Sequence, residues 1–229
     1  MATFVLVHGA YQGGWIWKPV VDRLRAAGHV AYAPTLDGCG ERRHAVRPGI
    51  TVATHAQEIA DFLFYEDLRD IVLAGTSSGG MVIVKAAELA RERIARLSFV
   101  DALALLPGER VDAITNRATP REVDEVTTAP SRADAEGRMF KDLEPSVRAW
   151  ALDRITPHPI AALEAPMVPT SFWDQQWPAS VIRCTQALNP PEAHQRRIAQ
   201  ELDASYREID TGHYPMLSAP DDLTKLLLE

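Results

Sequence analysis

The sequence predicts an α/β fold: a mostly parallel sheet of about six strands, flanked by helices on both faces. Two observations carry this prediction. Short apolar runs alternate with segments of helical spacing near both ends of the chain. The apolar runs are continuous rather than alternating, which is typical of strands buried on both faces. A length of 229 residues suits a single domain over residues 1–229.

The first hundred residues supply four of the expected strands. These strands cover residues 4–7, 29–33, 70–74 and 97–100. Helical spacing of apolar residues lies between them, at residues 20–27, 55–64 and 80–93. Gly28 follows the first helix as a natural C-cap, and Pro34 stops the second strand. This order predicts strand–helix–strand units with parallel neighbours.

The pattern changes after the strand that ends at Asp101. Over residues 103–178 the strand signals vanish, prolines recur, and short amphipathic stretches such as 147–155 appear. We therefore expect residues 103–178 to form a helical cap, inserted into the domain over an active site. The strand–helix pattern then returns, with strands at 180–185 and 205–209 and helices at 192–202 and 220–228.

Charge and composition limit the binding partners and the cellular location that we expect for this chain. The formal net charge is −7, and Lys and Arg do not cluster, so neither nucleic acid nor a membrane is an expected partner. The chain has no secretory signal and no apolar run near the roughly 18–20 residues of a membrane span, which predicts a cytoplasmic protein. Cys184 lies in an apolar run and is expected to be a buried free thiol.

A glycine-rich turn carries the chemistry. Residues 75–80 read Gly-Thr-Ser-Ser-Gly-Gly and lie between an expected strand and an expected helix. In that context G-x-S-x-G is a nucleophile elbow, and Ser77 holds its third position. A phosphate-binding turn is the alternative, but no P-loop Lys follows Gly80. We predict that Ser77 is a nucleophile, in preference to Ser78.

The same strand edge offers backbone donors for an oxyanion. The first strand ends in Val7-His8-Gly9-Ala10, where this arrangement places one donor, and the residue after the nucleophile supplies the other. We expect an oxyanion hole made by the backbone N–H groups of Ala10 and Ser78. His8 is expected to be structural.

The base and the acid follow from chain order. Of seven histidines, only His213 follows the last strand and precedes the last helix, so it is the expected base. The loop at 185–191 contains no carboxylate before Glu192, and Asp210 is too close to His213 in sequence to reach behind its ring easily. Asp101 ends a strand at the edge where ligands bind and is the expected acid. A helix N-cap or a solvated loop residue is the alternative for Asp101.

Three segments resemble one branch of a known superfamily. FVLVHGA with the following GGWIW, then GTSSGG, then TGHYPMLSAP resemble the α/β-hydrolase branch of plant methyl esterases, hydroxynitrile lyases and bacterial pyrethroid-type esterases. The resemblance implies no cofactor and hydrolysis of a carboxylic ester through an acyl-enzyme. Plant members carry an Asp where this chain has Gln186-Ala187. The lyases carry a Lys directly after the catalytic His, where this chain has Tyr214, and this disfavours lyase chemistry.

The expected activity is that of a serine esterase acting on a small to medium, largely apolar ester. Trp15, Trp173, Trp177 and Tyr214 are candidates to line its substrate pocket, with ordinary packing as the alternative for the tryptophans. No segment has a metal-ligand spacing, so no metal is expected. A lyase, an acyltransferase or a cyclase with the same triad, or a non-catalytic ligand-binding protein, remains an alternative. The sequence also leaves a homodimer open.

Overall fold

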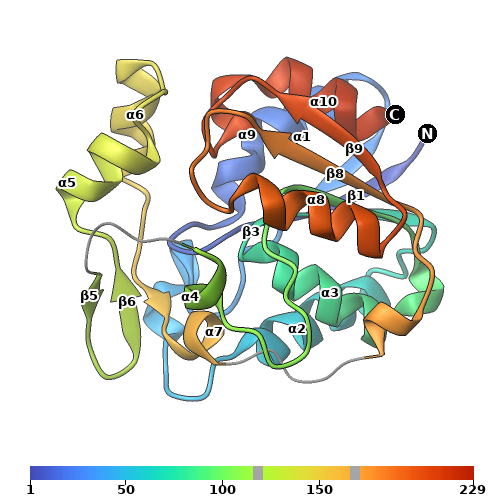
Figure 1. Ribbon diagram of the computed structural model, residues 1–229, viewed down its shortest axis with the longest axis horizontal. Coiled ribbons are helices and arrows are strands. Elements are labelled where there is room, and N and C mark those ends of the chain that lie inside the picture. Colours follow the sequence, from blue (N-terminus) through green and yellow to red (C-terminus); the bar gives the residue numbers. More distant parts are fainter. Residues whose placement is uncertain (116–120, 166–170) are drawn as a thin grey trace.

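Six parallel strands form the central sheet of the computed structural model, which describes residues 1–115, 121–165 and 171–229 (Figure 1). The strands lie in the order β2-β1-β3-β4-β8-β9. Their bounds are Thr3–Val7 (β1), Val30–Tyr32 (β2), Ile71–Ser77 (β3), Ile94–Ala102 (β4), Ala179–Cys184 (β8) and Ser205–Ile209 (β9). The number of strands and their parallel pairing confirm the predicted fold class.

Helices cover both faces of this sheet. Side chains of β1 alternate between two apolar cores, with Phe4 and Leu6 in one and Val5 and Val7 in the other. The Phe4 core packs against α1 and α10, and the Val5 core packs against α2, α3 and α8 (Figure 1). The bounds are Lys18–Ala26 (α1), Val52–Tyr65 (α2), Gly79–Leu89 (α3), Glu192–Glu201 (α8) and Pro220–Leu228 (α10).

The segment between β4 and β8 is only partly helical. It contains Val111–Ile114 (α4), Arg132–Asp134 (α5), Pro145–Leu152 (α6) and Ala161–Glu164 (α7). It also contains an antiparallel sheet of Glu122–Val123 (β5), Thr127–Ala129 (β6) and His158–Pro159 (β7), which the expectation of a helical cap did not include. Strands of two or three residues are too short to leave a periodic pattern. Residues 116–120 and 166–170 of the predicted cap lie outside the described residues.

Backbone and side-chain hydrogen bonds attach this insertion to loops that follow the sheet strands. The N–H of Thr156 donates to the carbonyl of Tyr11 at 3.0 Å, and its hydroxyl accepts from the N–H of Gly40 at 3.0 Å. The N–H of Gly212 donates to the carboxylate of Asp142 at 2.9 Å. The insertion therefore contacts the loops at the carboxyl ends of the strands, the edge where α/β sheets bind ligands. That it works as a cap remains a prediction.

Two further features concern the chain as a whole. None of the described helices is both long and apolar enough to cross a membrane. Cys39 and Cys184 are buried free thiols, as the apolar context of Cys184 predicted.

Candidate active site

Ser77 ends β3 in a turn that ordinary residues rarely adopt. Its φ is +52°, and α3 begins two residues later at Gly79. A Cβ on Gly79 would lie 2.6 Å from the carbonyl oxygen of His8, and a Cβ on Gly75 would lie 2.7 Å from the carbonyl oxygen of Gly79. Only glycine fits at such distances, because β3, the turn and the loop after β1 are in direct contact. The strand, the turn and the helix thus form the predicted elbow around Ser77.

Asp101 reaches the site through an irregularity in β4. Val100 pairs with Thr76 and Ala102 pairs with Ser77, so Asp101 is an extra residue in the strand. Its φ is +44°. A bulge of this kind redirects a side chain that the regular alternation would send elsewhere. The carboxylate of Asp101 consequently points along the strand edge, toward the loop that carries His213.

The Asp101 carboxylate holds the imidazole of His213. Its Oδ2 lies 2.5 Å from Nδ1 of His213, and its Oδ1 accepts the N–H of Cys184 at 3.1 Å. Because the carboxylate can only accept, Nδ1 carries the proton and Nε2 is left as the basic nitrogen. Asp101 is fully buried, and burial raises its pKa, while the hydrogen bond from His213 offsets part of the rise.

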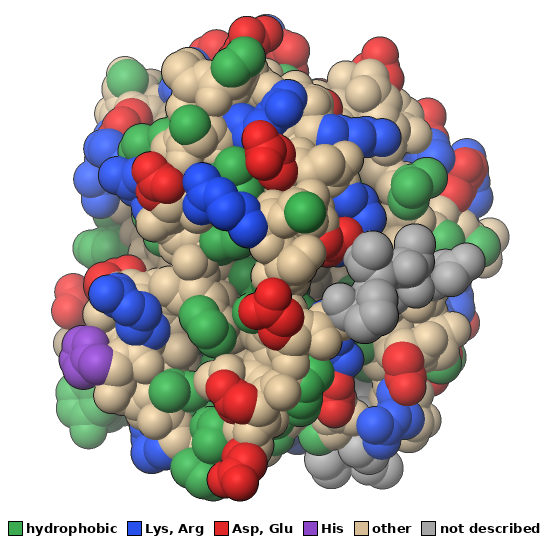
Figure 2. Space-filling view, turned by 90° about the vertical axis from the view of Figure 1, so that its left-hand side faces the viewer, with side chains coloured by type: hydrophobic (Ala, Val, Ile, Leu, Met, Phe, Trp, Pro, Cys, Tyr) green, Lys and Arg blue, Asp and Glu red, His purple; other side chains and the backbone are tan. Residues whose placement is uncertain are grey.

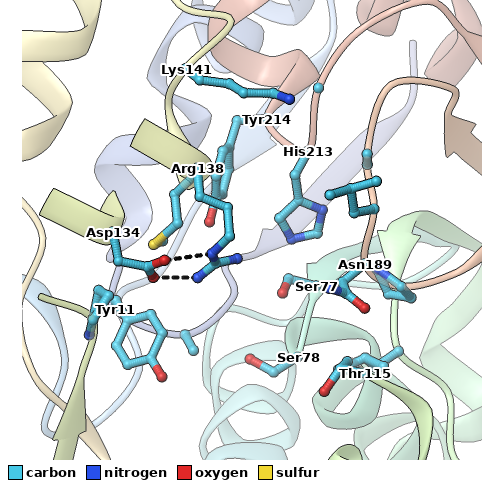
Figure 3. A pocket seen from close by; sticks show the side chains of 18 of the residues that line it. Tyr11, Ser77, Ser78, Thr115, Asp134, Arg138, Lys141, Asn189, His213 and Tyr214 are labelled. Atoms are coloured by element: carbon cyan, nitrogen blue, oxygen red, sulfur yellow. Dashed lines mark hydrogen bonds and ion pairs between the residues drawn. The ribbon is translucent and has the colours of Figure 1, made fainter. Parts of the chain in front are cut away.

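Ser77 and His213 line one cavity of about 140 Å³. Figure 3 shows the ring of His213 directed toward the side chain of Ser77, with the insertion facing both from the opposite wall. Ala10 and Ser78 line the same cavity. Ser78 directly precedes α3, so its N–H belongs to the positive end of that helix. Their expected part in an oxyanion hole is compatible with these positions.

The other carboxylates near His213 in sequence have different partners. Asp210 accepts from the hydroxyl of Thr185 at 2.7 Å and from the amide of Gln186 at 3.1 Å. These hydrogen bonds, that of Thr185 first, lower the pKa of Asp210. Glu192 pairs with Arg196 at 2.7 Å and with Arg183 at 3.0 Å. Neither carboxylate has a hydrogen bond to His213 among the described residues.

The three tryptophans expected at the pocket lie elsewhere, which corrects that expectation. Trp15 packs edge-to-face against Trp150, with 5.3 Å between ring centroids. The indole N–H of Trp173 donates to the carbonyl of Leu105 at 3.2 Å, and Trp177 stacks on Phe172. Large aromatic rings bury well in any core, so their type alone did not locate the pocket. Of the four candidates, only Tyr214 lines the cavity in the described part of the chain.

Sequence reasoning missed most of the opposite wall. The polar side chains that line the cavity from the insertion are Thr115, Arg121, Asp134, Arg138, Lys141 and Asp142, and Tyr11 lines it from the loop after β1. In the insertion the sequence shows no motif and no periodicity that would single these residues out. Tyr11 directly follows the predicted oxyanion residue Ala10, and this adjacency was the only available signal.

His8 is structural, as expected. Its Nε2 accepts the N–H of Leu36 at 3.0 Å, so Nδ1 carries the proton and donates to the carbonyl of Gly9 at 2.8 Å. Burial lowers the pKa of His8 to about 4. Across residues 1–115, 121–165 and 171–229, no three His, Cys, Asp or Glu residues gather so that they could hold a metal ion.

Comparisons with known proteins agree with this fold. Residues 4–226 match the alpha/beta hydrolase family. The carbendazim hydrolyzing esterase of Nocardioides sp. (strain SG-4G) is 33% identical over 73% of this chain and 74% of its own length. Methylesterase 7 of Arabidopsis thaliana is 27% identical over 99% of this chain and 95% of its own.

Solved structures show the same fold. A methylesterase from Arabidopsis superposes with a TM-score of 0.83 at 18% identity, covering 100% of this chain and 98% of that one. A pyrethroid hydrolase from Sphingobium faniae superposes with a TM-score of 0.80 at 20% identity, covering 99% and 96%. The chain belongs to the alpha/beta hydrolase family.

Proposed function

We propose that this chain is a serine hydrolase that cleaves a small carboxylic ester through an acyl-enzyme, with Ser77, His213 and Asp101 as its catalytic triad. The observation that carries the proposal is the hydrogen bond of 2.5 Å between Asp101 and His213 beside the strained Ser77. This bond fixes the imidazole tautomer that a general base needs. The proposal agrees with the esterase and hydrolase names of the relatives.

The reaction proceeds in two halves. In the first, Oγ of Ser77 attacks the ester carbonyl carbon while Nε2 of His213 takes the hydroxyl proton. The N–H groups of Ala10 and Ser78 donate to the oxyanion, and Asp101 stabilises the imidazolium. His213 then protonates the departing alcohol, which leaves an acyl group on Ser77. In the second half His213 activates a water molecule, and the acid leaves with regeneration of Ser77.

Hydrolysis is favoured over lyase chemistry at this site. An alpha-hydroxynitrile lyase of Arabidopsis thaliana is 33% identical, over 43% of this chain. In this chain Tyr214 follows the histidine, is buried, and has a pKa raised by that burial. A neutral phenol at this position carries no positive charge, whereas a Lys directly after the histidine would supply one.

The test is reaction of the purified protein with a fluorophosphonate, together with hydrolysis of p-nitrophenyl acetate and butyrate. We expect wild-type labelling at Ser77, and Ser77→Ala should lose labelling and about 10⁶-fold in kcat. Ser205→Ala, which removes an exposed serine at the start of β9, is the matched control and should keep both. If Ser77→Ala retained more than a tenth of the rate, the assignment of the nucleophile would be wrong.

A further inference from the structure

A cation faces the nucleophile across the cavity. Figure 3 shows the guanidinium of Arg138, on the insertion, in front of the pair formed by Ser77 and His213. Arg138 and both of these residues line the cavity. Nothing in the proposed ester hydrolysis uses this guanidinium, so its position calls for a separate explanation.

Arg138 is held in place by Asp134. Nε of Arg138 donates to Oδ1 of Asp134 at 2.7 Å, and Nη2 donates to Oδ2 at 2.5 Å. This bidentate ion pair fixes the plane of the guanidinium, which a single hydrogen bond would not do. The remaining nitrogen, Nη1, has no hydrogen-bond partner among the described residues, and Figure 3 shows the free end of the group directed into the cavity.

The backbone that carries Arg138 has an unusual turn. The N–H of Phe140 donates to the carbonyl of Ala135 at 3.0 Å, a hydrogen bond that spans five residues rather than the usual four. Such π-type turns are rare and are frequently found at functional sites. The turn changes the direction in which Arg138 leaves the chain, relative to an α-helix that continued from α5.

Other donors on this wall also lack acceptors. Arg121 pairs with Glu164, but its buried Nη1 has no hydrogen-bond partner within the described residues, and neither has the buried hydroxyl of Tyr11. Lys141 makes no ion pair with the described residues. A bound ligand with acceptor atoms is one way to satisfy such donors, although buried donors without a partner also occur away from the cavity in the described residues.

The remaining charged group of the cavity is a carboxylate bound to the backbone. Asp142 accepts the N–H of Gly212 at 2.9 Å, and so holds the loop before His213. The face of the molecule that carries the insertion shows basic and acidic side chains interspersed, without a field of one sign (Figure 2). The net charge of −7 repels anions at long range. Any preference for an anion must therefore come from the local donors around Arg138.

We propose that Arg138 is a specificity residue that selects esters carrying a carboxylate on their acyl or alcohol part. This inference rests on the proposed ester hydrolysis and narrows its substrate class. Nη1 of Arg138 donates to the substrate carboxylate while the ester carbonyl lies at Ser77. The expectation of a largely apolar ester then holds for the apolar side chains that line the cavity, Leu103, Met139 and Leu163, and not for the part of the cavity beside Arg138.

The test compares esters of matched shape that differ in charge. On the acyl side, 4-nitrophenyl hydrogen glutarate is compared with 4-nitrophenyl valerate; on the alcohol side, 4-acetoxybenzoate is compared with 4-tolyl acetate. Wild type should prefer the anionic member of one pair by about tenfold in kcat/KM, and that pair identifies the side. Arg138→Gln should reduce this ratio to about one.

Arg132→Gln is the matched control, because it removes the same charge from α5 at an exposed residue outside the cavity lining. It should keep the wild-type ratio. Equal ratios in wild type and Arg138→Gln, or the same change in both variants, would overturn the inference while leaving ester hydrolysis intact.

A binding measurement separates this inference from the proposed function. In Ser77→Ala, calorimetric titration with the four uncleaved esters should show tighter binding of the same anionic member, and Ser77→Ala/Arg138→Gln should lose it. If wild type hydrolyses none of the four esters, the proposed hydrolysis fails for them and the titration still decides the inference. Equal affinity for the anionic and neutral members in Ser77→Ala would refute it.

Discussion

A single buried carboxylate controls the proton on His213. In wild type, Oδ1 of Asp101 accepts from Cys184 and Oδ2 accepts from His213. In Asp101→Asn the amide oxygen can still accept the N–H of Cys184, but the amide N–H group then faces Nδ1 of His213. Nδ1 must accept this hydrogen bond, so the ring proton moves to Nε2. That nitrogen then cannot accept the proton of Ser77. We expect kcat for p-nitrophenyl butyrate to fall by about 10³–10⁴.

Glu192→Gln is the control for Asp101→Asn. Glu192 is exposed and paired with Arg183 and Arg196, so its loss should change kcat by less than about twofold, because surface ion pairs contribute little. Circular dichroism should show both variants folded. Near-wild-type kcat in a folded Asp101→Asn would mean that another group orients His213.

At the scale of elements, the elbow depends on the contact between α3 and the loop after β1. A methyl group on Gly79 would lie 2.6 Å and 2.7 Å from the carbonyl oxygens of His8 and Val7. Backbone atoms of a sheet cannot move aside cheaply, so Gly79→Ala should lower the free energy of unfolding by about 1–3 kcal/mol or more. Urea denaturation measures this loss.

Gly137→Ala makes the same chemical change where there is room. A Cβ on Gly137 would meet nothing within 4 Å, and its φ is not positive. This variant should be neutral or gain up to about 1 kcal/mol, because alanine restricts the unfolded chain. Equal urea midpoints for the two alanine variants would show that the close approach at Gly79 is not a constraint.

The elements differ in how well the sequence predicts them. Most sheet strands and their helices were predictable, because the strands form continuous apolar runs and the helices full helical periods. The edge strand β9, Ser-Tyr-Arg-Glu-Ile, was placed by its position before His213 in the chain. Ser77 and His213 followed from chain order and one glycine motif. The bulge that turns Asp101 toward His213, and the turn that carries Arg138, depend on backbone conformation that composition does not encode. The short strands β5, β6 and β7 gave no signal because two or three residues are too few to form a periodic pattern.

At the scale of the whole molecule, buried histidines lie between the insertion and the sheet domain. His158 of β7 packs against His55 of α2, with 5.9 Å between ring centroids, and its Nδ1 lies 3.4 Å from Sγ of Cys39. His55 donates to the carbonyl of Asp37 at 2.9 Å. Burial is the main cause that lowers the pKa of His158, of His55 and of His8.

These lowered pKa values make the stability of the fold depend on pH, with a definite sign. A histidine whose folded pKa lies below the unfolded value of about 6.5 stays neutral in the fold while the unfolded chain takes up a proton. Its contribution is therefore complete above pH 6.5 and is lost as the pH falls toward the folded pKa, about 4 for His8. Each such histidine costs about 1.4 kcal/mol per pH unit inside that window.

We expect the urea midpoint to fall steadily from pH 6.5 to pH 5, a range above the usual pKa of carboxylates. The raised pKa of Asp101 acts with the opposite sign, but it is one group against several buried histidines, so the histidines dominate the change. His158→Asn should lower the free energy of unfolding at pH 7.5. It should also reduce the slope of that free energy against pH by the share of one proton, about 1.4 kcal/mol per pH unit, because one buried titrating ring is gone. His44→Asn, which removes an exposed ring, should keep the wild-type slope. Constant wild-type stability between pH 7.5 and pH 5 would contradict the account, because four buried neutral rings, these three and that of His194, would then leave the free energy of unfolding unchanged. If His158→Asn and wild type had the same slope of unfolding free energy against pH, His158 would not contribute to the pH dependence of stability.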